Sequence, residues 1–185
     1  MYFIRAYQKK DAEALKQICV ETASVMFRGK KLTERALVDV YCRYYIEHEP
    51  ENCFVVVDEK DVAKGYILCA KNYDGYQKIF KKNYLKTWNL ATYIMGNFAL
   101  KSIRDYVKEY PAHLHIDLLQ ECQGQGYGRK LIETLIRHLK EQKVKGLMLH
   151  VSMQNEGARA FYKKCGFQVL HADKHDVLMG MKLEM

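Results

Sequence analysis

The segment Gln123-Gly124-Gln125-Gly126-Tyr127-Gly128-Arg129 joins an expected strand to an expected helix. Residues 112–119 before it alternate apolar and polar side chains, a pattern that predicts a strand. After it, apolar residues recur at helical spacing: Leu131, Ile132, Leu135, Ile136 and Leu139. Glycines bring backbone N–H groups close to a ligand, and a helix N-terminus adds about half a positive charge. The segment therefore predicts a loop that binds a pyrophosphate.

The spacing of these glycines argues against two nucleotide-binding motifs. A P-loop requires Gly-Lys-Ser/Thr at the start of the helix, whereas the chain has Gly128-Arg129-Lys130-Leu131. A Rossmann fingerprint requires G-x-G-x-x-G after the first strand, whereas these glycines read G-x-G-x-G in the second half of the chain. A plain turn is the alternative at this point.

Two motifs resemble those of the Gcn5-related N-acetyltransferases (GNAT family). Gln123, Gly126 and Gly128 match the acyl-CoA signature Q/R-x-x-G-x-G/A. Downstream, Asn155-Glu156-Gly157-Ala158-Arg159-Ala160-Phe161-Tyr162-Lys163-Lys164-Cys165-Gly166-Phe167 is similar to N-x-x-A-x-x-F-Y-x-x-x-G-F of the same family. The motifs occur in the family's order and are separated by one helix and one strand.

This resemblance implies a sheet whose fourth and fifth strands splay apart, so that the pantetheine arm of acetyl-CoA enters the gap like an extra strand. Residues 123–129 would hold the pyrophosphate, while Leu118 and Leu119 would offer backbone groups to the arm. The cofactor-binding residues implied are Leu118, Leu119, Gln123, Gly124, Gln125, Gly126, Tyr127, Gly128, Arg129 and Asn155. No metal is expected.

Residues of the second motif have plainer alternatives. Asn155 would bind the pantetheine, cap its helix, or do both. Phe161 is expected to belong to the core. The resemblance gives Tyr162 the role of the acid that protonates the departing thiolate, although a buried tyrosine with a satisfied hydroxyl is the alternative.

Acetyl transfer to an amine also needs a group that takes a proton and a donor for the oxyanion. The donor is expected from backbone N–H near Leu118. His113, His115 and Asp117 share one parity of the strand and so one face. Asp117 and His115 are the preferred catalytic candidates; a similar histidine pair is thought to serve serotonin N-acetyltransferase. A structural polar network, or a bulge that swaps the faces, is the alternative.

A closer resemblance covers nearly the whole chain, more loosely before residue 60. It rests on Lys64-Gly65-Tyr66-Ile67-Leu68, the long insertion, and Tyr110-Pro111-Ala112-His113-Leu114-His115-Ile116-Asp117. These segments look like bacterial acetyltransferases similar to the C-terminal acetyltransferase-like domain of O-GlcNAcase. That animal domain has lost the glycine loop, which is intact here, so the resemblance supports cofactor binding and leaves the acceptor open.

The whole pattern predicts an α/β fold of the order β-α-α-β-β-(insertion)-β-α-β-α-β-β, a mixed and mostly antiparallel sheet with helices on both faces. Strands are expected at residues 2–7, 53–57, 62–70, 112–119, 147–152, 167–170 and 177–183. Helices are expected at about 11–22 with Asp11 as N-cap, at 33–47, from the glycine loop to Gly146, and at 155–165 before Gly166. Residues 72–110 predict a mostly helical insertion within a single domain of residues 1–185.

Composition narrows the class of protein. The chain of 185 residues has 49% hydrophobic and 28% charged residues and two prolines, as folded proteins do. No apolar run reaches the ~18 residues of a membrane span, and no signal peptide is seen, so a cytoplasmic location and no membrane partner are expected. Six cysteines without a C-x-x-C pair indicate reduced thiols. The net charge of +8 is spread along the chain, so no nucleic-acid partner is expected.

The sequence thus predicts an acetyl-CoA-dependent N-acetyltransferase that acts on a small-molecule or peptide amine, with a homodimer left open. A non-enzymatic acyl-CoA-binding or interaction module of the same fold is the main alternative. A basic nucleic-acid-binding domain is the second. The acceptor pocket is expected from the first helices and the insertion, where tyrosines would line it or pack: Tyr73, Tyr76, Tyr84 and Tyr93.

Overall fold

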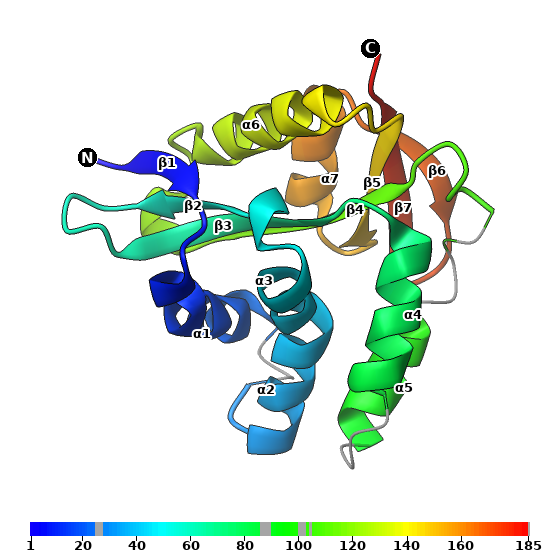
Figure 1. Ribbon diagram of the computed structural model, residues 1–185, viewed down its shortest axis with the longest axis horizontal. Helices are drawn as coiled ribbons and strands as arrows, with labels where there is room; N and C mark the ends of the chain where they lie inside the picture. Colours follow the sequence, from blue (N-terminus) through cyan, green and yellow to red (C-terminus); the bar gives the residue numbers. More distant parts are fainter. Residues whose placement is uncertain (25–27, 86–89, 100–102, 104, 185) are drawn as a thin grey trace.

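One mixed sheet of seven strands forms the centre of the computed structural model, which describes residues 1–24, 28–85, 90–99, 103 and 105–184 (Figure 1). The strands follow the spatial order β1-β2-β3-β4-β5-β7-β6. Their bounds are β1 (Phe3–Ala6), β2 (Phe54–Val57), β3 (Ala63–Ala70), β4 (Ala112–Leu118), β5 (Gly146–Ser152), β6 (Gln168–Ala172) and β7 (Asp176–Lys182). All neighbouring pairs are antiparallel except β4 and β5. The predicted mixed, mostly antiparallel sheet is confirmed.

Helices cover both faces of this sheet, as the sequence predicts. Figure 1 shows α1, α2 and α3 on one face and α6 on the other. The bounds are α1 (Ala12–Thr22), α2 (Lys31–Val38), α3 (Tyr44–His48), α4 (Tyr73–Asn83), α5 (Leu90–Ala99), α6 (Tyr127–Glu141) and α7 (Glu156–Lys164). Short 3-10 turns precede α1, β2 and the glycine loop: η1 (Lys9–Asp11), η4 (Pro50–Asn52) and η5 (Gln120–Cys122). No helix among the described residues is long and apolar enough to cross a membrane.

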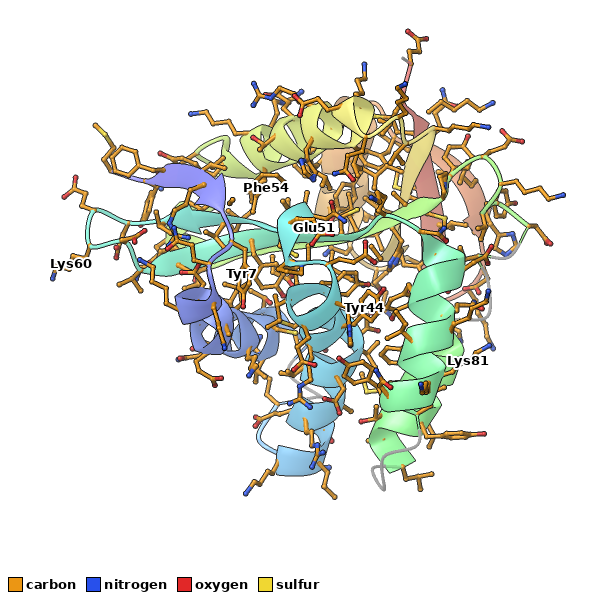
Figure 2. The ribbon with its side chains drawn as sticks, in the orientation of Figure 1. Tyr7, Tyr44, Glu51, Phe54, Lys60 and Lys81 are labelled. Carbon is orange, nitrogen blue, oxygen red and sulfur yellow. The ribbon has the colours of Figure 1, made fainter. Side chains whose placement is uncertain are left out.

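The sheet divides the core in two, because successive residues of a strand point to opposite faces. On β3, Tyr66, Leu68 and Ala70 pack with α1, α3 and α4, whereas Ile67 and Cys69 pack with α6 and α7. Figure 2 shows the same division elsewhere in the chain, with labelled side chains on the α3 side and on the α6 side. Both faces therefore contribute to one site wherever the sheet opens.

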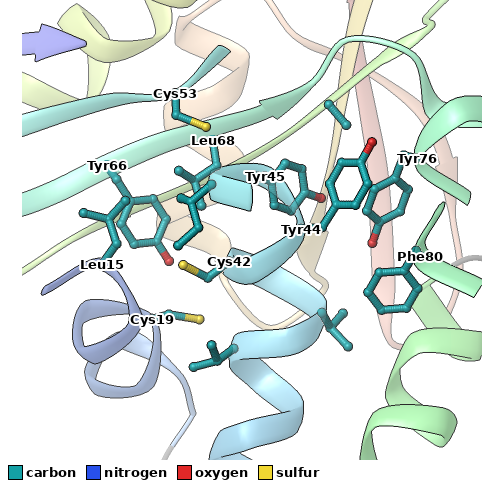
Figure 3. Close-up of a cluster of buried hydrophobic side chains, with 14 of the residues drawn as sticks. Leu15, Cys19, Cys42, Tyr44, Tyr45, Cys53, Tyr66, Leu68, Tyr76 and Phe80 are labelled. Carbon is teal, nitrogen blue, oxygen red and sulfur yellow. The ribbon is translucent and has the colours of Figure 1, made fainter. Parts of the chain in front are cut away.

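Aromatic side chains dominate the core between α3 and α4 (Figure 3). Tyr73 and Tyr76 are almost fully buried, and Tyr84 is 5% exposed. Tyr76 and Tyr84 stack with Phe80, and the ring of Tyr73 is tilted against that of Tyr76, so none of the three opens onto a cavity. Of the tyrosines that were candidates for the acceptor pocket, these three pack, and Tyr93 on α5 is about half exposed at 53%.

The predicted helix at 33–47 contains a π turn that the sequence pattern does not reveal. α2 and α3 are joined by η3 (Asp39–Arg43), which has π-helical hydrogen bonding. Asp39 is fully buried there, and its carboxylate receives Arg43 at 2.6 Å and the hydroxyl of Thr92 from α5 at 3.2 Å. This buried anchor ties α5 to the turn, and π turns of this kind are frequent at functional sites.

One local expectation is confirmed in position alone, since Asp11 is the N-cap residue of α1, and another is wrong. Asp11 precedes α1, but its side chain does not cap the helix. Its carboxylate instead receives both guanidinium nitrogens of Arg5, at 2.7 and 2.9 Å, and the backbone N–H of Gln8. Gly146 does not end the helix after the glycine loop; α6 ends at Glu141, and Gly146 begins β5. A Cβ at Gly146 would lie 2.3 Å from the carbonyl oxygen of Glu109, so glycine is needed there for close packing.

The expected insertion is helical where it is described. α4 begins after Asn72, whose side chain accepts a hydrogen bond from the N–H of Gly75 at 3.1 Å, and α5 packs against α2. Residues 86–89, 100–102 and 104 of this segment lie outside the described residues. The assignment of residues 1–185 to one domain stays a prediction.

Candidate active site

A cleft of about 940 Å³ opens where β4 and β5 part. The two strands pair only at Ala112–Leu147 and His113–Met148. Beyond these pairs, β4 continues along β3 as far as Leu118, and β5 continues along β7 as far as Ser152. The splay that the resemblance implied is therefore present, and each strand has one edge that no neighbouring strand covers.

Alternation along each strand decides which backbone groups face this gap. The N–H of Leu119 donates to the carbonyl of Lys64 on β3, so residues of that parity on β4 turn their backbone to β3. The intervening residues Ile116 and Leu118 then face the gap. On β5, the N–H of Met153 donates to His175, which leaves the other parity facing β4. The cleft thus offers two unpaired strand edges to an extended ligand.

Most of the predicted site residues line this cleft. They are His115, Asp117, Leu118, Gln123, Gly124, Gly126, Gly128, Arg129, Asn155 and Tyr162. They come from β4, the glycine loop, the start of α6, and α7. Two motifs that are separated in the sequence by a helix and a strand thus meet at one opening in the sheet.

The side chains of three predicted cofactor-binding residues do not line the cleft. Leu119 has its N–H bound to Lys64 and its carbonyl bound by Cys122, both at 2.9 Å. The side-chain amide of Gln125 donates to the carbonyl of Glu121 at 2.7 Å. Tyr127 points its hydroxyl at the carbonyl of Tyr2, 3.2 Å away, and packs edge-on against that ring. Gln125 and Tyr127 have backbone N–H groups left for a ligand, whereas Leu119 has none.

The glycine loop is built to present its backbone. Gly124 and Gly126 have φ of +73° and +83°, a region that favours glycine, and a Cβ at either position would meet no atom within 4 Å. No described residue accepts a hydrogen bond from the N–H of Gly124, Gln125 or Gly126. Gly126 is the N-cap of α6, where no side chain caps the first turn. The loop and the helix start therefore aim unpaired N–H groups into open space, as an anion site requires.

Side chains brace this loop from both sides. Gln123 donates from its amide to the carbonyl of Leu118 at 2.8 Å. Arg129 donates to the carbonyl of Lys164, at the end of α7, at 3.2 Å. A Cβ at Gly128 would lie 3.1 Å from the ring of Phe161, so α6 and α7 are in close contact there. The loop is fixed between β4 and α7 before any ligand arrives.

Tyr162 reaches the cleft from α7. It is 9% exposed, and its ring packs against Phe161 and Phe167. Among the described residues, the structure shows no hydrogen bond to its hydroxyl. Burial, reinforced by the charge of Asp117, raises the pKa of Tyr162 well above its usual value. The hydroxyl is therefore a protonated donor at neutral pH.

Asn155 caps α7 at the rim of the cleft. Its Oδ1 accepts a hydrogen bond from the N–H of Ala158 at 3.0 Å, which confirms the capping role. The cap uses the oxygen, so the amide NH₂ is left to donate. Capping and ligand binding are compatible here.

The polar face of β4 has the predicted parity, since its register with β3 runs without a bulge from Ala70–His113 to Gly65–Leu118. Its three members differ in surroundings. His113 is buried away from the cleft, with its Nδ1 3.1 Å from the hydroxyl of Tyr45. His115 and Asp117 line the cleft. The structural-network reading thus fits His113.

Electrostatics separate the other two. Burial, together with the nearby His150, lowers the pKa of His115 to about 3. Burial raises the pKa of Asp117, and a hydrogen bond of 2.5 Å donated by the hydroxyl of Tyr66 partly offsets that rise. Asp117 is therefore the more basic of the two.

Several lining residues were missed. His150 lies on β5, and burial lowers its pKa to about 4. A polar residue within the apolar run Leu147-Met148-Leu149-His150-Val151 was the available signal. Six further lining residues lie on α1, just after the end of α1, on α2 and on η3: Cys19, Thr22, Ala23, Ser24, Leu37 and Tyr41. Together they form the helical wall of the cleft. No described residue of 72–110 lines the cleft, and no described cluster of His, Cys, Asp and Glu could hold a metal ion.

Known proteins share this fold. The crystal structure of SsHAT matches with a TM-score of 0.85 and 28% identity, covering 100% of this chain and 99% of that one. The PaiA N-acetyltransferase from Thermoplasma acidophilum in complex with coenzyme A matches with a TM-score of 0.65 and 17% identity, covering 98% and 99%; this likeness shows the fold alone. The 5-NmdU N-acetyltransferase of Pseudomonas phage PaMx11 is 41% identical over 68 residues, 36% of this chain and 46% of the phage protein. The chain thus matches less than half of that relative's length.

One family accounts for both the fold and the two motifs. Its sequence model, described as the acetyltransferase (GNAT) family, matches residues 18–167. The matched span includes the splayed strands, the glycine loop and α7. Because it takes in most of the 185 residues, the chain belongs to the acetyltransferase (GNAT) family.

Proposed function

We propose that this protein is an acetyl-CoA-dependent N-acetyltransferase that moves an acetyl group to a primary amine by direct attack on the thioester. The observation that carries this proposal is the opening between β4 and β5, where unpaired strand edges, a loop of unpaired N–H groups, a buried tyrosine hydroxyl and a buried carboxylate meet in one cleft. No single part of that set requires acetyl transfer. Together they supply a place for the cofactor and a group for each proton.

The residues fit acetyl-CoA on the geometry of the loop. The N–H groups of Gly124, Gln125 and Gly126 have no acceptor among the described residues, and a Cβ at Gly124 or Gly126 would meet no atom within 4 Å, so the loop of residues 124–129 has room to hold the pyrophosphate. Backbone groups of Leu118, together with the amide of Asn155, would hold the pantetheine arm. When bound, acetyl-CoA supplies the activated acetyl group and a thiolate leaving group. The N–H of Leu118 faces the gap and would stabilise negative charge on the carbonyl oxygen.

Asp117 is proposed as the base. An amine acceptor arrives protonated and must lose a proton before it attacks. A carboxylate whose pKa is raised by burial accepts that proton more readily than an imidazole whose pKa is about 3. His115 would then act as a neutral hydrogen-bonding group beside the carboxylate. Tyr162 is proposed as the acid, because its hydroxyl is protonated and free of other described partners.

The main alternative is a non-enzymatic acyl-CoA-binding module. The intact geometry of the glycine loop supports cofactor binding in either case. It also fits the proposed kinship with bacterial acetyltransferases similar to the C-terminal domain of O-GlcNAcase. The buried Asp117 and Tyr162 favour the enzyme, because a binding module needs neither. Release of free thiol from acetyl-CoA, with or without an acceptor, separates the two.

Acetyl-CoA is expected to raise the melting temperature of the protein. A ligand that binds the native state alone stabilises it by RT ln(1 + [L]/Kd), about 2.7 kcal/mol at a hundredfold excess over Kd. Differential scanning fluorimetry and isothermal calorimetry measure this. Saturating acetyl-CoA without a shift and without heat would refute the cofactor assignment.

Gly126→Val is expected to weaken acetyl-CoA binding at least about tenfold, because the side chain fills the space where the N–H groups converge. The substitution also strains the backbone, since φ is +83°. Gly29→Val is the matched control: Gly29 has a φ of +80°, has equally open surroundings and lies outside the cleft. Both variants should lose similar stability by thermal melting. Equal loss of affinity in the two variants would show that strain, not the anion site, is responsible.

A further inference from the structure

We infer that the acceptor is a small primary amine whose body carries no negative charge, because the described lining of the cleft beside Asp117 holds an acidic group and no lysine or arginine. This inference rests on the proposed function and narrows it. The relevant part of the cleft lies between the helical wall and a floor formed by His115, Asp117 and His150.

Charge is distributed unevenly along the cleft. The chain has 30 lysine and arginine residues, yet among those that the structure describes the one that lines the cleft is Arg129, at the glycine loop. The helical wall is made of uncharged residues. A patch of average composition on so basic a protein surface would include lysine or arginine side chains. The acceptor half therefore differs from the rest of the protein in charge.

The titratable groups that line this half, other than the carboxyl group of Asp117, are neutral at pH 7. The pKa of His115 is lowered to about 3 and that of His150 to about 4, so neither imidazole is cationic. The pKa of Tyr41 is raised to about 12, and burial keeps the thiol of Cys19 protonated by raising its pKa. Among the described lining residues of this half, Asp117 is the one acidic side chain, and none is a lysine or arginine.

The end of α1 adds to this preference for a cation. Three lining residues, Thr22, Ala23 and Ser24, are at its C-terminal end, where a helix carries about half a negative charge. The last turn of α1 has no basic residue. Arg28 donates to the carbonyl of Ala23 at 2.7 Å, but it is exposed and is not among the lining residues. The guanidinium of Arg28 offsets part of that charge, and a carboxylate on the acceptor would still face Asp117 and the remaining carbonyl groups of this helix end.

The body of the acceptor follows from the remaining lining. Leu37 and Ala23 are apolar, and the ring of Tyr41 stands edge-on to His115 with 5.0 Å between centroids. These groups can bury alkyl or aromatic carbon and cannot pair with a phosphate or carboxylate. Decarboxylated amines and neutral derivatives of amino acids fit this description, and free amino acids do not.

The test compares three acceptors that differ by one group. Tyrosine and tyrosinamide have nearly the same shape but differ in charge, and tyramine lacks the group altogether; norleucine, norleucinamide and pentylamine repeat the series without a ring. Thiol release from acetyl-CoA gives kcat/KM for each. Calorimetric titration of each amine into protein saturated with coenzyme A gives affinity without turnover. We expect tyrosinamide and tyramine to exceed tyrosine at least about tenfold in both measurements.

A charge variant makes the same point from the side of the protein. Ser24 is exposed, so Ser24→Arg adds a cation at the cleft without disturbing the core. It should raise KM for tyramine about three- to tenfold and narrow the difference between tyrosine and tyrosinamide. Gln17→Arg is the matched control, since Gln17 is exposed on α1, the helix that precedes Ser24, and lies outside the cleft. It should leave both values unchanged.

The outcomes separate the inference from the proposal beneath it. The inference is overturned if tyrosine has the same kcat/KM and affinity as tyrosinamide. It is also overturned if tyramine alone is favoured over tyrosine and tyrosinamide is not, because the size of the substituent would then decide. Acetyl-CoA binding without binding or turnover of any uncharged-bodied amine overturns the inference and leaves cofactor binding standing. No acetyl-CoA binding overturns the proposed function and the inference together.

Discussion

Tyr162→Phe should lower the turnover number by about 10² to 10³ and leave the affinity for acetyl-CoA nearly unchanged. A positioned general acid contributes ~10² to 10⁴ in rate, and a thiolate is a tolerable leaving group near neutral pH, so the lower part of that range applies. Phenylalanine keeps the ring and its packing against Phe161 and Phe167. The variant therefore removes the proton and little else. Steady-state kinetics with any productive acceptor, together with calorimetry, measure both quantities.

Tyr106→Phe controls for the loss of a tyrosine hydroxyl elsewhere in the fold. Its hydroxyl donates to the carbonyl of Leu170 at 2.9 Å and lies outside the cleft. This control should lose some stability, of order 1 kcal/mol, and keep its turnover number. A Tyr162→Phe variant within about threefold of wild type would remove the hydroxyl from the mechanism. A rise in the KM for acetyl-CoA at unchanged turnover would assign it to binding instead.

The parts of the site that were predicted from sequence are those governed by local rules. A glycine that must adopt positive φ at the end of a helix is recognisable because few other residues tolerate it. Gly126 before α6 and Gly166 after α7 both have such φ values. The shared face of His115 and Asp117 follows from alternation along a strand, which holds here because no bulge interrupts β4. The order of the strands follows from the resemblance.

Leu119 shows what the alternation of backbone groups along a strand implies for cofactor binding. Consecutive residues of a strand direct their backbone groups to opposite sides, so Leu118 and Leu119 cannot both face the gap between β4 and β5. The hydrogen bond from Leu119 to Lys64 shows which one faces β3. Alternation alone would have excluded one of the two.

The helical wall depends on tertiary packing, and no local pattern reveals it. Thr22 and Ser24 reach the cleft because α1 ends beside β4, and Tyr41 reaches it through a π turn in a segment whose spacing reads as ordinary α-helix. Asp11 shows the same limit. A carboxylate before a helix predicts a cap, but Arg5 from a neighbouring strand takes both of its oxygens. The ion pair with Arg5, six residues earlier in the chain, overrides the local preference for a cap at this position.

Asp117→Asn should lower kcat/KM by about 10² or more while leaving the protein at least as stable at pH 7. The activity falls because the amide cannot take the proton of the acceptor. The stability result follows from the sign of the pKa shift. Burial raises the pKa of Asp117 in the folded protein above its usual value, so the folded state binds that proton more tightly than the unfolded state. Stability from this group is full below the ordinary pKa and is lost as pH rises through the raised one. At pH 7 the buried carboxylate is thus a net cost, which the amide removes while still accepting the hydrogen bond from Tyr66.

The acid limb of the pH–rate profile identifies the base. If Asp117 is the base, the turnover number at saturating acceptor falls with decreasing pH above the ordinary aspartate value of 3.8, because the folded pKa is raised. If His115 is the base, activity persists towards pH 3, where its imidazole gains a proton. Tyr66→Phe sharpens the distinction, since loss of its hydrogen bond raises the pKa of Asp117 further and moves the limb to higher pH.

A limb that does not move in Tyr66→Phe, or an Asp117→Asn variant that keeps wild-type turnover, would show that the proton goes elsewhere. A variant that loses stability together with activity would make Asp117 a structural group, because a buried carboxylate kept for catalysis alone should cost stability rather than supply it.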